Sequence, residues 1–183
     1  MNTSNIKRIA PQARRSFINA VMKRLNELGI YSDSQIAESS QQGELLNIEG
    51  RHYDIKIRLL RDRLVAKVNK LGFLPLVENV AYTWFNRLCA IRYMELHDYL
   101  DHGFRVLSHP NNPKTFEILE HAQDIAEELG LNRNQIIELK LAGNKDEQLY
   151  RELLIGQCHQ LHKAMPFLFE ALDDETELLL PDN

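Results

Sequence analysis

The sequence predicts an all-α fold, and three features of the chain support this prediction. Apolar residues recur at spacings of three and four along most of its 183 residues, which is the period of an amphipathic helix. Glycine and proline interrupt these patterns where helices are expected to end. The apolar and charged fractions, 44% and 26%, are those of a globular protein. We therefore expect an irregular multi-helix bundle around a central apolar helix at about residues 75–98, with little or no sheet.

The first two helices are expected on either side of a polar segment. The first begins near Pro11, which suits a first helical turn, and ends at Gly29. Residues 32–43 are rich in Ser and Gln and are expected to form a mobile loop. The second helix covers about residues 53–71, and its apolar stripe consists of Ile57, Leu60, Leu64, Val68 and Leu71. Its first six residues, YDIKIR, alternate as a strand does, but the longer stripe favours a helix.

The remaining chain is expected to hold the central helix and several shorter ones. The central helix begins near Pro75, and the segment FRVLS at 104–108 is expected to be extended. Further helices are expected over residues 114–129, 133–142 and 146–165.

The central helix carries two charged residues on its apolar side. At about 100° per residue, one wide arc contains Val77, Ala81, Trp84, Phe85, Leu88, Ile91 and Met94. Arg92 and Glu95 project into the same arc, three residues apart. An unpaired buried charge costs several kcal/mol, so we expect both to be buried and paired with each other or with neighbouring helices. A catalytic carboxylate is the alternative interpretation of Glu95.

Charge is distributed unevenly along the chain. Residues 1–70 carry 13 Lys/Arg and 7 Asp/Glu, a net charge of +6, whereas residues 113–183 carry 6 and 15, a net charge of −9. One row on the second helix consists of Lys56, Arg63, Lys67 and Lys70, and the first helix adds Arg14, Arg15, Lys23 and Arg24. Such a row can contact the phosphates of a DNA duplex without reading its sequence. A solvated helix face is the alternative.

Several other classes of protein and site do not fit the sequence. No window approaches twenty uncharged apolar residues, and the charged N-terminus does not fit a signal peptide, so we expect a cytoplasmic protein without membrane contact. Cys89 and Cys158 are expected to be buried thiols. Cys158, His159 and His162 offer too few ligands for a closed zinc site, so we expect no metal. We also find no pattern for a nucleophilic catalytic site.

Residues 80–100 also carry a resemblance to a known family. The stretch VAYTWFNRLCAIRYMELHDYL, followed by RVLS at 105–108, resembles the N-terminal helical region of BREX-type adenine-specific DNA methyltransferases, the PglX family. QCHQLHKAMPFLFE at 157–170 and LLLPDN at 178–183 are similar to the next landmark of that region. PQARRSFINAV at 11–21 is similar to the first helix of the family.

The resemblance implies bacterial phage defence by N6-methylation of adenine in duplex DNA with S-adenosylmethionine. The family's catalytic part has an F-x-G-x-G-like turn for the cofactor and an N-P-P-Y tetrapeptide that grips the flipped adenine. Neither is present here, and the nearest string, HPNNPKTF at 109–116, has one proline after the asparagines and lacks the tyrosine that stacks on an extruded base.

We therefore expect residues 1–183 to be a single non-catalytic helical N-terminal domain and a fragment of a longer chain. Its parts are a basic part at 1–72, the core helix at 75–98 and an acidic helical part at 113–172. No catalytic residue and no cofactor are expected in it, whereas the parent enzyme is expected to use S-adenosylmethionine. The expected partners are double-stranded DNA, bound weakly through the basic N-terminal part, and either its own catalytic domain or other defence-system proteins. The alternative function is a protein–protein interaction module, in which the acidic C-terminal half contacts another defence-system component.

This chain alone is predicted neither to bind S-adenosylmethionine nor to methylate DNA, because it lacks both motifs. Calorimetric titration with the cofactor should give no binding heat. Micromolar binding would contradict the prediction.

Overall fold

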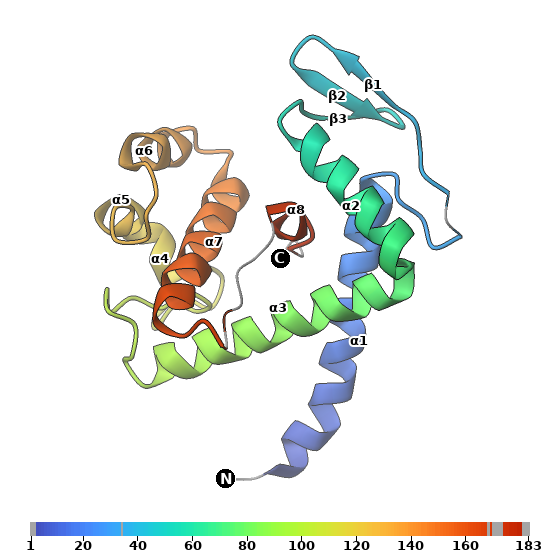
Figure 1. Ribbon diagram of the computed structural model, residues 1–183. Helices are drawn as coiled ribbons and strands as arrows, with labels where there is room; N and C mark the ends of the chain where they lie inside the picture. The colour runs from blue at the N-terminus through green and yellow to red at the C-terminus, as the bar shows by residue number, and fades with distance from the viewer. Residues whose placement is uncertain (1–2, 34, 168, 170–173, 181–183) are drawn as a thin grey trace. The chain divides into compact units, whose positions relative to one another are not determined.

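The computed structural model describes residues 3–33, 35–167, 169 and 174–180 (Figure 1). Contacts between residues divide them into two compact units. The first unit holds the described residues up to Phe85 together with residues 174–180, and the second holds the described residues from Asn86 to 169.

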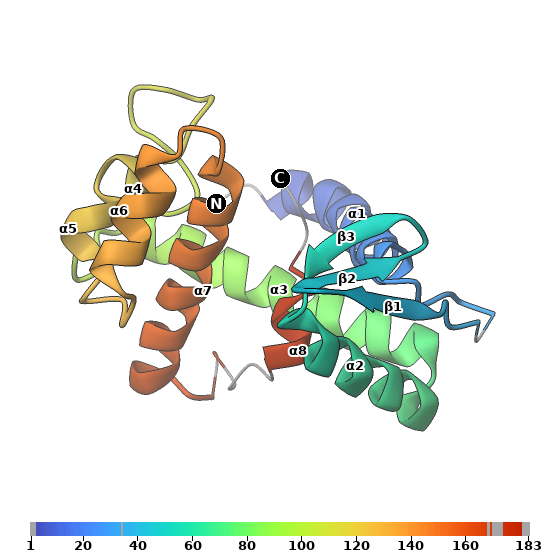
Figure 2. The same cartoon turned by 90° about the horizontal axis from the view of Figure 1, so that it is seen from above.

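The first unit combines helices with a small sheet. Its elements are α1 (Thr3–Glu27), β1 (Ser39–Gln42), β2 (Leu45–Ile48), β3 (Arg51–Asp54), α2 (Ile57–Leu71), the first half of α3 (Phe73–Leu96) and α8 (Asp174–Glu177). The strands are antiparallel in the order β1-β2-β3 (Figure 2), and α8 packs against α2. Pro11 lies inside α1 rather than in its first turn.

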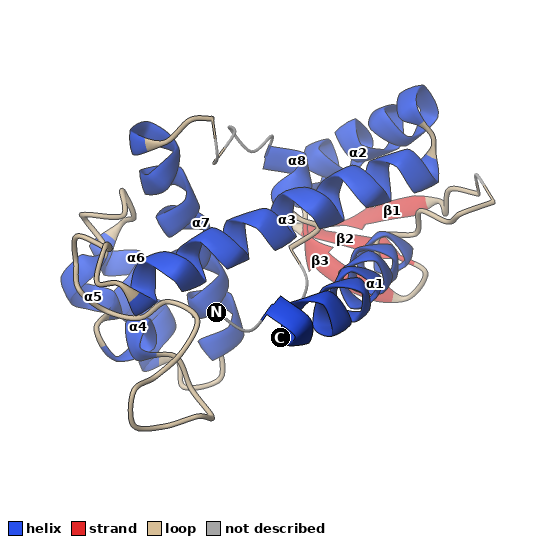
Figure 3. Ribbon diagram, turned by 90° about the horizontal axis from the view of Figure 1, so that it is seen from below, coloured by secondary structure: helices blue, strands red, loops and turns tan. Residues whose placement is uncertain are grey.

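The prediction of an all-α fold with little or no sheet is wrong, because residues 39–54 form three short strands (Figure 3). Two-residue turns join them, and the second turn, Glu49-Gly50, has positive φ at both residues (49° and 82°). This backbone suits the twist of a tight hairpin. The periodicity concealed the sheet because each strand has only four residues and β1 (SSQQ) has no apolar residue.

The sheet also changes the start of the second helix. The sequence placed a helix over residues 53–71, whereas Tyr53 belongs to β3 and α2 begins at Ile57. One face of β2 is covered, since Leu46 and Ile48 are buried while Leu45, on the other face, is exposed. The Tyr53 hydroxyl donates to the Glu27 carbonyl at 2.7 Å, which ties this face to the end of α1.

A tight junction follows the end of α1. Gly29 has φ +68°, and a Cβ atom added there would lie 2.6 Å from the Cβ of Ala37 and 2.8 Å from Cγ2 of Ile48. Beside it, the buried guanidinium of Arg61 donates to the Leu28 carbonyl at 2.7 Å and to the Ala37 carbonyl at 2.6 Å. Burial lowers the pKa of Arg61 below its ordinary value. The junction therefore joins α1, the segment before β1 and α2.

The second unit is helical in its regular parts. It contains the second half of α3, then α4 (Glu117–Glu120), α5 (Ala122–Ile125), α6 (Arg133–Leu141) and α7 (Asp146–Ala164). Helix α7 packs against α4 and α6, and α5 packs against α6. The helix expected over residues 114–129 is replaced by two single turns that meet at His121. The buried residues of the second unit include Ile118, Ile125, Ile136, Leu139, Leu149 and Leu153.

Gly29→Ala is predicted to destabilise the chain more than Gly43→Ala. Both glycines have positive φ, which costs an alanine about 1–2 kcal/mol, but a Cβ at Gly43 meets nothing within 4 Å. The clash at Gly29 adds about 1–3 kcal/mol of overpacking. Denaturant titration gives both losses, and equal values would refute the steric part of this account.

Candidate nucleic-acid interface

The basic row predicted from the sequence lies along α2, with its first member just outside the helix. Lys56 occupies the N-cap position with helical backbone angles (φ −56°, ψ −28°), so it continues the line of α2 toward β3. Lys56, Arg63 and Lys70 are exposed, while Lys67 is half-buried. The opposite side of α2 is buried through Leu64 and Val68. The two ends of the row, Lys56 and Lys70, therefore face solvent.

An acidic side chain from the end of the chain meets the middle of this row. The Glu175 carboxylate lies 3.0 Å from Nζ of Lys67 and 3.9 Å from Nη1 of Arg63. Its side chain is only 9% exposed. The sequence does not predict this contact, because 108 positions separate Lys67 from Glu175. The acidic run DDETE at 173–177 indicates that carboxylates are present, but the sequence does not identify which cation they contact.

The basic residues of α1 fall into two groups. Arg14 and Arg15 are exposed, and no ion pair joins them to another residue that the structure describes. Arg24 binds Glu27 at 2.9 Å, and Lys23 lies 3.8 Å from the same carboxylate. Arg14 and Arg15 are therefore the more accessible pair for an anion.

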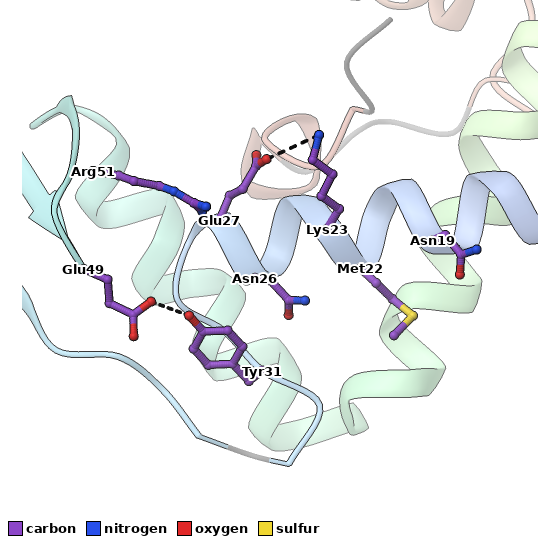
Figure 4. A pocket seen from close by; sticks show the side chains of 8 residues that line it. All are labelled: Asn19, Met22, Lys23, Asn26, Glu27, Tyr31, Glu49 and Arg51. Atoms are coloured by element: carbon purple, nitrogen blue, oxygen red, sulfur yellow. Dashed lines mark hydrogen bonds and ion pairs between the residues drawn. The ribbon is translucent and has the colours of Figure 1, made fainter.

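A separate polar groove of about 520 Å³ lies between α1 and the β2–β3 turn (Figure 4). Its lining residues are Asn19, Met22, Lys23, Asn26, Glu27, Tyr31, Glu49 and Arg51. The Tyr31 hydroxyl donates to the Glu49 carboxylate, and this bond raises the pKa of Tyr31. Two acidic and two basic residues balance one another, so the groove lacks the excess positive charge of a phosphate-binding surface.

The charged pair of α3 is arranged differently from the expectation. Trp84 is fully buried and Glu95 is buried, but the Arg92 side chain is 45% exposed, so the prediction that both charges are buried is wrong. Arg92 donates to Glu95 from the surface, because a long guanidinium side chain can keep its charged end in water. Leu88 is half-buried.

The Glu95 carboxylate anchors the loop that follows α3. One oxygen accepts from the backbone N–H groups of Val106 (2.9 Å) and Leu107 (2.8 Å), and the other accepts from the Ser108 hydroxyl (3.1 Å) and Arg92. The two oxygens of this buried carboxylate are occupied by four donors of the fold, so the group is closed to substrate. This geometry favours a structural role over a catalytic one.

Sequence reasoning also missed a buried cation on α3. Arg87 is 1% exposed, although the sequence analysis left it out of the buried arc. It lies three residues after Trp84 and four before Ile91, a spacing that identifies the same helix face. The spacing in the sequence was therefore sufficient to place Arg87 on the buried face of α3.

Three further expectations concern the burial of the cysteines, metal binding and membrane contact. Cys158 is buried and Cys89 is exposed, which corrects the expectation of two buried thiols. Among the described residues, no three His, Cys, Asp or Glu side chains are placed to hold a metal ion. No helix in the described part of the chain is long and apolar enough to cross a bilayer.

Glu95→Ala is predicted to destabilise the chain by about 3–5 kcal/mol, because it strands the buried donors of the 106–108 loop. Arg92→Ala should cost about 0–1 kcal/mol, because that partner is exposed and Glu95 keeps its three other donors. Thermal and denaturant unfolding of the two variants measure the difference. A loss below about half a kcal/mol for Glu95→Ala would refute the anchoring role.

Comparison with known proteins identifies relatives over the whole chain. The chain is 58% identical over 188 residues to the adenine-specific methyltransferase BrxX of Escherichia coli O9:H4 (strain HS), an alignment that covers all of this chain. It is 34% identical over 196 residues to the adenine-specific methyltransferase PglX of Lacticaseibacillus casei (strain Zhang), covering 98% of this chain. No family model matches the sequence.

The chain spans 16% of the length of each of these two curated relatives. The comparison therefore concerns one part of much longer proteins. The resemblance carried by residues 80–100 is confirmed: this chain is homologous, essentially throughout, to part of the BREX-type adenine-specific methyltransferases.

Proposed function

We propose that this chain is a non-catalytic helical N-terminal domain of a phage-defence enzyme that methylates adenine at N6 in duplex DNA. In this proposal it helps to position the duplex or to dock the catalytic domain. The relatives named adenine-specific methyltransferases support the parent activity. The lack of F-x-G-x-G and N-P-P-Y in these 183 residues supports a non-catalytic role. S-adenosylmethionine would bind elsewhere in the parent enzyme, and a cytoplasmic location remains a prediction.

The observation that carries the DNA-positioning role is the exposed basic row on α2. From Lys56 to Lys70 the row covers 14 helical steps, or about 21 Å at a rise of 1.5 Å per residue. One DNA strand carries a phosphate about every 3.4 Å along the duplex axis, so the row is long enough to lie beside about six phosphates. Lysine and arginine contacts of this kind position a protein without specifying sequence.

A docking role is the second candidate, and an exposed aromatic cluster in the second unit favours it. Tyr93, Leu96 and Tyr99 are each more than half exposed at the end of α3. His97 lies between the two tyrosines, with ring centroids 4.4 Å from Tyr93 and 5.6 Å from Tyr99. Exposed aromatic and apolar groups of this kind are common where another protein surface binds. The partner would be the enzyme's own catalytic domain or another defence-system protein.

Replacing Lys56 and Lys70 with glutamine in the full-length protein is predicted to weaken binding to duplex DNA and to reduce its salt dependence. Each lost phosphate contact lowers the slope of log affinity against log salt by about 0.9, so two contacts remove about 1.8. Fluorescence anisotropy with a labelled duplex between about 50 and 200 mM salt measures both quantities.

A matched control replaces Lys114 and Lys145, two exposed lysines of the second unit, with glutamine. This variant removes the same charge and should leave the slope unchanged. Equal effects in the two variants would show a general charge effect. An unchanged slope in both would remove DNA contact from the α2 row and leave the docking role.

A further inference from the structure

The basic row on α2 already holds an anion from its own chain. The two carboxylate oxygens of Glu175 approach different cations, Lys67 at 3.0 Å and Arg63 at 3.9 Å. The cations retain solvent access, since the side chain of Lys67 is 27% exposed and that of Arg63 is 49% exposed. The carboxylate therefore sits at the centre of the row, with exposed lysines toward both ends.

Contacts other than the ion pairs hold the Glu175 segment in place. Leu179 and Leu180 are buried, and Nε of Arg24 donates to the Leu178 carbonyl at 3.1 Å. Helix α8 packs against α2 in the same unit. The segment is thus anchored by apolar burial and a backbone hydrogen bond, and the carboxylate is presented to the row at a fixed position.

Carboxylate and phosphate oxygens accept from the same N–H donors of lysine and arginine. We propose that the Glu175 carboxylate occupies the position of a DNA phosphate on α2 and competes with DNA for Lys67 and Arg63. This inference rests on the proposed DNA-positioning function. Because Glu175 belongs to the same unit, its local concentration at the row is constant and independent of protein concentration. Glu175 then sets the strength of DNA contact at the middle of the row.

The test is Glu175→Gln in the full-length protein, with a labelled DNA duplex as the probe. Glutamine keeps the size of the side chain and removes its charge, so the positive charge of Lys67 and Arg63 is no longer offset by Glu175. We expect the affinity to rise about two- to tenfold and the salt slope to steepen by about 1–2. Glu78→Gln, at an exposed position on α3 in the same unit, removes the same charge but leaves the contacts of Glu175 with Lys67 and Arg63 in place, so it should have little effect.

A second pair of variants identifies the cations through which Glu175 acts. In a background of Arg63→Gln and Lys67→Gln, the further change Glu175→Gln should produce no gain in affinity. A gain that persists in this background would overturn the proposal, because it would come from the general loss of negative charge. Glu175→Asp keeps the charge but shortens the side chain, and a smaller gain is expected from it. Thermal unfolding of each variant checks that the fold is retained.

The remaining outcomes separate this inference from the proposed function. If the Lys56 and Lys70 variant weakens DNA binding while Glu175→Gln changes nothing, the DNA-positioning function stands and the competition by Glu175 is refuted. If neither variant changes affinity or slope, the α2 row does not contact DNA, and both the DNA-positioning role and the competition by Glu175 are refuted.

Discussion

The buried guanidinium of Arg61 joins the segments on which the first unit is built. It reaches from α2 to the Leu28 carbonyl after α1 and to the Ala37 carbonyl before β1. Hydrogen bonds to a charged group contribute about 1.5–3 kcal/mol each, more than the 0–1 kcal/mol typical of a surface ion pair. The hydrogen bonds of Arg61, on the buried side of α2, therefore fix the orientation of this helix within the first unit. Two residues further on, Arg63 is exposed on α2, so arginines close together on one helix have different roles.

In the second unit, a buried side chain of the opposite charge also binds irregular backbone. Glu95 accepts from two backbone N–H groups and a hydroxyl of the loop after α3, as Arg61 donates to two backbone carbonyls in the first unit. Irregular backbone near a core leaves donors and acceptors that helices and sheets would otherwise satisfy. In both units a buried charged side chain satisfies them. These charges are parts of the fold, whereas Lys56 and Lys70 at the ends of the α2 row are exposed to a partner.

The sequence predicted those parts of the fold whose periodicity extends over several helical turns. Helices α2, α3, α6 and α7 all lie within about four residues of their expected bounds. The hairpin was missed because its strands are short, although Glu49-Gly50 was a readable turn signal. Arg92 was misplaced because angular position on a helix does not reveal how far a long side chain extends toward water. The contact between Glu175 and Lys67 depends on tertiary folding, and no spacing rule predicts it.

The same contact changes the meaning of the charge distribution. By sequence, residues 1–70 have a net charge of +6 and the acidic residues lie at the other end of the chain. In the folded first unit, the described residues up to Phe85 and those from 174 to 180 carry 13 Lys/Arg and 11 Asp/Glu, a net charge of +2. A nearly balanced unit exerts little long-range attraction on DNA, so binding would depend on local contacts with exposed cations such as Arg14 and Arg15 on α1 and Lys56 and Lys70 in the α2 row. With so few phosphate contacts, affinity would be weak and independent of sequence. Such a surface would suit the proposed role of holding a duplex without reading its sequence.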